Sequence, residues 1–140
     1  MKKLLKISTL FLFFGVMYWN CTALSESDKV VEEFYNGIKT QKYDKIVSML
    51  DTAAIAINPA SDWTNMFSDN QTKLGNLKNF SKTSFNTTIN DGVSKTVMDY
   101  TVEYEKNTTY ERFIIVERSG IYKILSWEFN TDKSGLETGK

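Results

Sequence analysis

The sequence predicts an α+β fold in which N-terminal helices pack on one face of a curved, four-stranded antiparallel sheet. In the first half of the 140-residue chain, apolar residues recur with helical spacing. After Gly75 the period changes to two, and three turn signals separate four candidate strands. Helices followed by a run of antiparallel strands are typical of a domain whose helices cover one sheet face.

The helices are predicted from apolar spacing and from breakers. The first is expected to start at an N-cap, Ser27, and to end near Thr40. Its apolar face has the i, i+3, i+4, i+7 spacing and consists of Val30, Val31, Phe34, Tyr35 and Ile38. A second helix is expected at 43–50 and a third at 61–74, with residues 51–60 as an apolar connector between them.

The strands are predicted from alternation between turns. Asn90-Asp91-Gly92 is a hairpin signal, and Asn107-Thr108 and Ser119-Gly120 indicate two further turns. The expected strands are residues 77–89, 96–105, 110–118 and 121–129. One face of the second strand is expected to carry Thr96, Met98, Tyr100, Val102 and Tyr104. One face of the last strand is expected to carry Ile121, Lys123, Leu125, Trp127 and Phe129.

The first 21 residues have the pattern of an export signal. Lys2, Lys3 and Lys6 precede an apolar run at 10–19, which is shorter than the about 20 residues that span a bilayer. The run is followed by Cys21, the only cysteine, so the chain cannot form an internal disulfide. We expect a helical signal peptide at 1–20, a tether at 21–27, one domain at 28–130 and a disordered tail at 131–140.

Cys21 resembles the lipid-attachment cysteine of bacterial lipoproteins, on the residues Met17-Tyr18-Trp19-Asn20-Cys21. The usual pattern has Leu three positions before the cysteine and a small residue directly before it, where this chain has Tyr18 and Asn20. The resemblance implies acyl chains such as palmitate on Cys21, and a place in the bacterial cell envelope. Two alternatives stay open: cleavage after Ala23, which releases a soluble secreted protein, and an uncleaved anchor.

Composition excludes several function classes. The chain has 17 basic and 17 acidic residues, and three of the basic ones lie in the predicted signal, so the remainder is weakly acidic. Nucleic-acid binding is not expected, because it requires a clustered basic face. The absence of histidine removes the commonest general base and a common metal ligand. No cofactor motif and no EF-hand spacing is present, so we expect neither a cofactor nor a metal; an all-carboxylate calcium site is the alternative that stays open.

The order of helices followed by a four-stranded meander resembles the nuclear transport factor 2-like superfamily, a cone-shaped α+β fold also described as cystatin-like. The resemblance covers residues 28–129. It rests on VVEEFYNGIKTQKYDKIVSML, on the Trp63-bearing helix that ends in KLG, and on the closing strand GIYKILSWEF. Members include dehydratases, isomerases, polyketide cyclases, assembly factors and many non-enzymes, so the resemblance implies a fold and no single activity. Self-association through the sheet is common among them, which implies a candidate homodimer.

The resemblance also implies a pocket inside the cone. The candidate lining residues are Tyr35, Trp63, Tyr100, Arg112 and Trp127. For the aromatic residues the plainer interpretation is core packing with one polar end. For Arg112 it is an edge position with a snorkelling stem, and the alternative is an inward guanidinium that binds an anion. Asp99 is a candidate base, but alternation places it with Thr101 and Glu103 on a solvated face.

We therefore expect a membrane-tethered, non-catalytic module that binds a small ligand or a protein partner. The alternative is a small cofactor-free enzyme of the dehydratase or isomerase type, which would use a carboxylate and tyrosines in the cone. A closed, aromatic-filled cone would favour binding through the outer sheet face. An open cavity with a buried carboxylate would favour catalysis.

Overall fold

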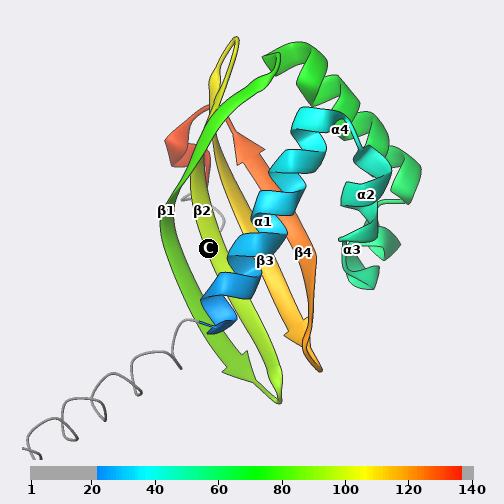
Figure 1. Cartoon of the computed structure of the whole chain (residues 1–140), viewed down its shortest axis with the longest axis vertical. Coiled ribbons are helices and arrows are strands. Elements are labelled where there is room, and N and C mark those ends of the chain that lie inside the picture. Colours follow the sequence, from blue (N-terminus) through cyan, green and yellow to red (C-terminus); the bar gives the residue numbers. More distant parts are fainter. Residues whose placement is uncertain (1–21, 137–140) are drawn as a thin grey trace, which may run out of the picture.

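A computed structural model describes residues 22–136 (Figure 1). The predicted signal peptide at 1–20 and Cys21 lie outside the described residues. The elements are α1 Thr22–Thr40, α2 Tyr43–Ser48, α3 Thr52–Ile57, α4 Ala60–Leu74, β1 Leu77–Asn90, β2 Val93–Tyr104, β3 Thr108–Arg118, β4 Ile121–Asn130 and a 3-10 helix, η1, Lys133–Leu136. None of the helices in this part of the chain has the length and hydropathy needed to cross a membrane.

The sheet is an antiparallel meander with the strand order β1-β2-β3-β4. Asp91 and Gly92 form a two-residue hairpin turn, and both have positive φ, 50° and 76°. Glycine adopts that conformation without the Cβ strain that other residues meet. The sheet curves around α1, which crosses its inner face, while α2, α3 and α4 lie beside α1 (Figure 1). The predicted α+β class and the four-stranded curved sheet are confirmed.

The helical half differs from the prediction at the start of α1, at Ser27 and in the connector at 51–60. α1 begins at Thr22, so residues 22–27 of the predicted tether are helical and Ser27 is a buried helix residue instead of an N-cap. The predicted connector at 51–60 contains α3, whose N-cap Asp51 accepts a hydrogen bond from the Ala53 N–H at 3.0 Å. A short helix with its own cap is difficult to distinguish from an apolar connector, because six residues give too little periodicity.

The C-terminal third differs at two places. A register shift between Ile114 and Ile115 interrupts the pairing of β4, so that Ile124 and Trp127 are both buried. The single face predicted for β4 is therefore wrong, because a β-bulge reverses the alternation on one strand. After β4, η1 occupies residues that were predicted to be a disordered tail.

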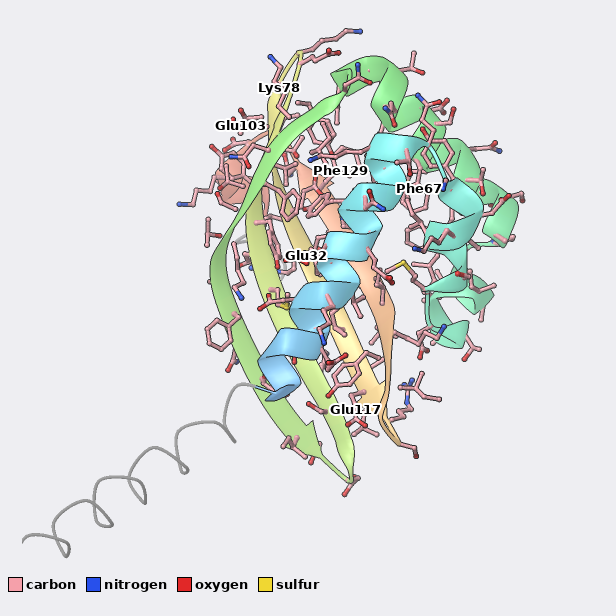
Figure 2. All side chains as sticks on the ribbon, viewed as in Figure 1. Glu32, Phe67, Lys78, Glu103, Glu117 and Phe129 are labelled. Carbon is pink, nitrogen blue, oxygen red and sulfur yellow. The ribbon has the colours of Figure 1, made fainter. Side chains whose placement is uncertain are left out.

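Aromatic rings fill the space between the sheet and the helices. Phe34 of α1 lies at the centre, with its ring centroid 5.0 Å from that of Phe113, 5.3 Å from Trp127 and 5.7 Å from Phe67. Figure 2 shows Phe67 and Phe129 between the sheet and the helices. Each such ring pair contributes about 0.5–1.5 kcal/mol beyond the burial of its area. The cone is consequently a packed core.

Candidate functional site

The inner face of the sheet carries one acidic residue among these rings, Glu111 of β3. Along β3 the buried side chains alternate with less buried ones, and the inward set includes Thr109, Glu111, Phe113 and Ile115. Glu111 has 0% exposure. A buried carboxyl is costly unless hydrogen bonds replace its water, so its partners decide how the site works.

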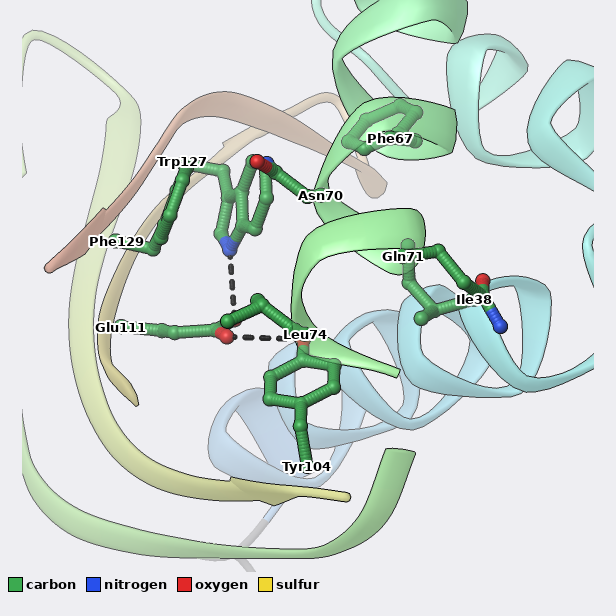
Figure 3. Close-up of a pocket in the computed structure, with 9 residues that line it drawn as sticks. All are labelled: Ile38, Phe67, Asn70, Gln71, Leu74, Tyr104, Glu111, Trp127 and Phe129. Atoms are coloured by element: carbon green, nitrogen blue, oxygen red, sulfur yellow. Dashed lines mark hydrogen bonds between the residues drawn. The ribbon is translucent and has the colours of Figure 1, made fainter. Parts of the chain in front are cut away.

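Four donors surround the Glu111 carboxyl. Oε1 accepts from the Tyr104 hydroxyl at 3.1 Å and from Thr109 Oγ1 at 2.7 Å. Oε2 accepts from the Tyr35 hydroxyl at 3.0 Å and from Trp127 Nε1 at 2.9 Å. Figure 3 shows the Tyr104 ring and the Trp127 indole meeting the carboxyl from two sides. Each carboxyl oxygen thus has two donors, which satisfies the group inside the protein.

The donors come from four different elements. Tyr35 belongs to α1, Tyr104 to the end of β2, Thr109 to β3 and Trp127 to β4. The register shift in the β3–β4 pairing gives β4 one extra residue between Ile124 and Ser126. The alternation of β4 therefore reverses there, and Trp127 faces inward as Ile124 does. The Glu111 carboxyl therefore cross-links the helix to three strands, and it holds residues that are far apart in the sequence.

The acid–base behaviour of the site follows from its burial. Burial raises the pKa of Glu111, while the four donated hydrogen bonds act in the opposite direction. Burial also raises the pKa of the Tyr35 and Tyr104 hydroxyls, and the neighbouring Glu111 carboxyl raises both further. Both tyrosines consequently stay protonated at neutral pH and remain donors to Glu111.

A small cavity lies beside Glu111. Its volume is about 10 Å³, close to the ~10–15 Å³ that one water molecule requires. The lining residues are Ile38, Phe67, Asn70, Gln71, Leu74, Tyr104, Glu111, Trp127 and Phe129 (Figure 3). The cavity can hold a single water molecule next to the carboxyl, and the rings around it leave no room for a substrate.

Three solved structures resemble this chain in fold. A protein from Campylobacter jejuni that is designated an NTF2-like transpeptidase is 11% identical to this chain, with a TM-score of 0.53. The match covers 71% of this chain and 97% of that one. Aln2 from a Streptomyces species is 9% identical, with a TM-score of 0.58 and coverage of 82% and 94%. The nuclear transport factor 2-like fold is shown. Bd1075 of Bdellovibrio bacteriovorus is 12% identical, with a TM-score of 0.56 over 78% of this chain, which spans 40% of Bd1075.

At these identities the likeness concerns the nuclear transport factor 2-like fold alone. No protein-family model matches the chain, and no curated protein matches it in sequence.

Within this fold, two of the predicted pocket residues meet at Glu111. Tyr35 and Trp127 both donate to its carboxyl. Tyr100 is buried nearby, but its hydroxyl points to Asp28, at 3.5 Å from Oδ1. Trp63 is buried against Phe67, with ring centroids 5.9 Å apart, and its Nε1 has no hydrogen-bond partner among the described residues. Cys21 lies outside the described residues.

Arg112 lies on the opposite face of the sheet from the cone. Its Nε and Nη2 donate to the Asp99 carboxylate at 2.7 and 3.1 Å, and Nη1 donates to the Leu136 carbonyl oxygen at 2.9 Å. These contacts hold η1 against the outer face. The hydrogen bonds from Arg112 lower the pKa of Asp99, and burial opposes them. The prediction that Arg112 lines the inner pocket is therefore wrong, because Glu111 takes the inward position on β3.

The outer face has its own small cleft beside this ion pair. It has a volume of about 70 Å³ and is lined by Thr83, Asp99, Tyr100, Tyr110, Arg112, Lys133 and Leu136. The ion pair is partly exposed, with 26% of the Arg112 side chain and 23% of the Asp99 side chain accessible. The cleft contains two cationic side chains and one carboxylate, so it presents a net positive charge.

Sequence reasoning missed Glu111, although one signal was available. In β3, Glu111 shares its face with Phe113 and Ile115, while Arg112 shares the other with Ile114 and Val116. Both faces carry large aliphatic residues, so alternation alone does not decide which face is inward. The aromatic ring of Phe113 was the one indication that favoured the Glu111 face. Within residues 22–136, no group of three or more acidic side chains is arranged to hold a metal ion.

Proposed function

We propose that this chain is an exported lipoprotein of the bacterial cell envelope, anchored through Cys21, whose domain binds a partner without catalysing a reaction. The filled cone carries the non-catalytic part of the proposal. The cavity beside Glu111 has a volume of about 10 Å³, whereas ligand sites usually have ~300–1,000 Å³. Both oxygens of the carboxyl are already occupied by internal donors.

A closed interior directs binding to the outer surface of the sheet. The cleft beside Arg112 supports this choice, because it combines an aromatic ring, Tyr110, with the cationic Arg112 and Lys133. The Asp99 carboxylate pairs with Arg112 and neutralises its charge. The positive charge of Lys133 is then in excess. An anionic group, such as a carboxylate of a peptide or small acid, is the complementary ligand.

The lipid anchor is tested by metabolic labelling. Cells that express the full chain are grown with an alkyne analogue of palmitate, and incorporation is compared between the wild type and Cys21→Ser. We expect label in the wild type and none in the variant, because the acyl chains are attached through the cysteine sulfur and N-terminus. Absence of label in the wild type, or equal label in both proteins, contradicts the anchor.

The binding surface is tested by site-specific photo-crosslinking in cells. A photoreactive amino acid replaces Tyr110 on the outer sheet face, and the control replaces Asn65 on α4, which is solvent-exposed. We expect crosslinks from position 110 that Arg112→Gln weakens, and none from position 65. Equal products from both positions contradict the proposed surface, and a product of twice the chain mass identifies a homodimer through the sheet.

A cofactor-free dehydratase or isomerase is a second candidate, favoured by one observation. Glu111 with the hydroxyls of Tyr35 and Tyr104, at 3.0 and 3.1 Å, is a carboxylate-and-tyrosine set of the kind that such chemistry uses. A substrate would have to displace Leu74 or Phe129, which line the cavity. The Trp127 indole N–H resonance reports entry directly. If a panel of small carbonyl compounds leaves that resonance unchanged, the enzymatic candidate fails.

A further inference from the structure

Exposed apolar side chains gather at one end of the sheet. Of the four large apolar residues that are most exposed in the described part of the chain, three are Phe85 at 54%, Ile89 at 76% and Ile121 at 61%. Phe85 and Ile89 belong to β1, and Ile121 begins β4. In this meander the β1–β2 and β3–β4 turns lie at the same end, as Figure 1 shows. We call these three residues the apolar end.

The apolar end includes the edge strand β1, whose outer edge is not covered by any segment of residues 22–136. On the other edge, β4 is bonded through Ile124 to Met49 and Asp51. No described segment bonds to the outer edge of β1 between residues 84 and 90, and this stretch, SFNTTIN, contains no charge and no proline. Exposed edge strands usually carry charged residues or proline, which prevent association with another strand. This end of β1 is therefore suited to contact another apolar or interfacial surface.

The chain also enters the domain at this end. Along α1, Tyr35 stacks on Phe80 with a centroid distance of 4.3 Å, and Asp28 bonds to Lys82 at 2.7 Å. The start of α1 and the tip of β1 therefore point in the same direction, because the residue nearer the start of α1, Asp28, contacts the residue nearer the tip of β1, Lys82. The start of α1 and the tip of β1 accordingly lie on the same side of the molecule (Figure 1).

Simple lengths show how far each element extends from the Asp28–Lys82 contact. Thr22 lies six residues before Asp28, which is ~9 Å of helix at 1.5 Å per residue. Ile89 lies seven residues beyond Lys82, which is ~23 Å of strand at about 3.3 Å per residue. The apolar end therefore extends beyond the point where the chain enters α1.

We propose that the apolar end rests in the headgroup region of the membrane to which the chain is anchored. This inference rests on the proposed function, because it takes Cys21 as the anchor. Cys21 is bonded to Thr22, and Ser27 of α1 is already buried against the domain. Only ~8 Å of helix separates the anchor from the packed domain. A lipid surface held this close lies on the side of the molecule where the start of α1 and the tip of β1 are found, so it can contact the apolar end.

The experiment places a fluorescent label at the apolar end of the anchored chain. Full-length protein with Ile89→Cys carries an environment-sensitive fluorophore and is reconstituted into vesicles of phosphatidylethanolamine and phosphatidylglycerol. The control is Glu103→Cys, because Glu103 lies at the opposite end of the sheet (Figure 2). Both positions are exposed, so labelling leaves the core intact. Ile121→Cys serves as a second reporter.

We expect headgroup-attached nitroxide lipids to quench the label at position 89 by at least about twofold, and to leave the label at position 103 unchanged. A second preparation separates this inference from the anchor. It carries Cys21→Ser and a polyhistidine tag before Thr22, and it binds vesicles through a nickel-chelating lipid. Quenching in this preparation without acylation in the first supports the membrane contact and overturns the anchor.

The inference is overturned if positions 89 and 103 are quenched equally in protein that sediments with vesicles. It is also overturned if the label at position 89 is shielded from lipid and from aqueous iodide, because a protein strand added to β1 would then cover it. Circular dichroism of the labelled proteins verifies that each is folded.

Discussion

Replacing Glu111 by leucine should unfold the domain, because four buried donors would lose their acceptor. The Glu111 carboxyl receives hydrogen bonds from Tyr35, Tyr104, Thr109 and Trp127. Leaving one buried donor unpaired costs about 1–3 kcal/mol, so four amount to ~4–12 kcal/mol. Domains of this size have a total free energy of unfolding of about 5–15 kcal/mol. The loss is therefore comparable to the whole stability.

Glutamine at the same position should be much less damaging. Trp127 Nε1 can only donate, so the amide oxygen must replace Oε2, where it still accepts from Trp127 and Tyr35. The amide nitrogen then replaces Oε1 and faces the hydroxyls of Tyr104 and Thr109, which can rotate and accept. We expect Glu111→Gln to lower the free energy of unfolding by about 1–3 kcal/mol.

Urea unfolding, followed by tryptophan fluorescence and by circular dichroism, measures both effects. For Glu111→Gln we expect a midpoint about 0.5–1.5 M lower, from a denaturant slope of ~2 kcal/mol per M. The matched control is Glu103→Gln, because Glu103 is an exposed carboxylate on the neighbouring strand. Its expected change is within about 0.5 kcal/mol. If Glu111→Leu is as stable as the wild type, the hydrogen-bond network does not hold the cone together.

The pH dependence of the same variants tests the electrostatic account. Burial raises the pKa of Glu111 above its ordinary value of 4.5, so the folded state holds the proton that the unfolded state releases. The corresponding stability is fully present below the unfolded pKa and is lost as pH rises through the folded pKa. Above pH ~5 the wild type should lose up to about 1.4 kcal/mol per pH unit until Glu111 ionises. Glu111→Gln should lack this slope, and equal slopes would refute the raised pKa.

Three further substitutions test the packing, the turn and the outer ion pair. A Cβ at Gly37 would lie 2.5 Å from Ile46 Cγ1, so Gly37→Ala should cost about 1–3 kcal/mol in thermal melts despite its better helix propensity. An unchanged melting temperature contradicts that contact. Gly92→Ala meets no atom within 4 Å, so only its positive φ should lower stability, by about 1 kcal/mol in the same melts. Arg112→Gln should raise the pKa of Asp99 in a carbon-13 titration, and an unchanged pKa contradicts the pairing.

The features that depend on local sequence were predictable. The two-residue hairpin at Asp91-Gly92 requires positive φ at both positions, and both have it. The alternation of β2 places Met98 and Tyr100 in the core, as expected, because no bulge interrupts its pairing with β3. The stop of α4 at Gly75 follows from the positive φ of that residue, 79°.

The features that depend on distant contacts were not predictable. The bulge between Ile114 and Ile115 is a property of two strands, and it decides that Trp127 faces the cone. The inward face of β3 is chosen by Phe34 of α1, which packs on Phe113. Glu111 lies on the same face of β3 as Phe113 and is therefore buried, whereas Arg112 lies on the outer face. Local alternation assigns these two residues to opposite faces but cannot say which face the helix will cover.

Burying a carboxyl among four elements carries a desolvation penalty, and the reason that the domain tolerates this penalty bears on its function. When all members of a buried polar network are replaced together by apolar residues of similar volume, stability is often unchanged or higher, whereas replacing one member alone is costly. The Glu111 network instead links α1, β2, β3 and β4, because its four donors come from these four elements and all bond to one carboxyl. The interior of a cone linked in that way is packed, with room beside Glu111 for about one water molecule. Two candidate surfaces for recognition are the Arg112 cleft on the outer face and the apolar end, and both belong to the sheet that the Glu111 network links to α1.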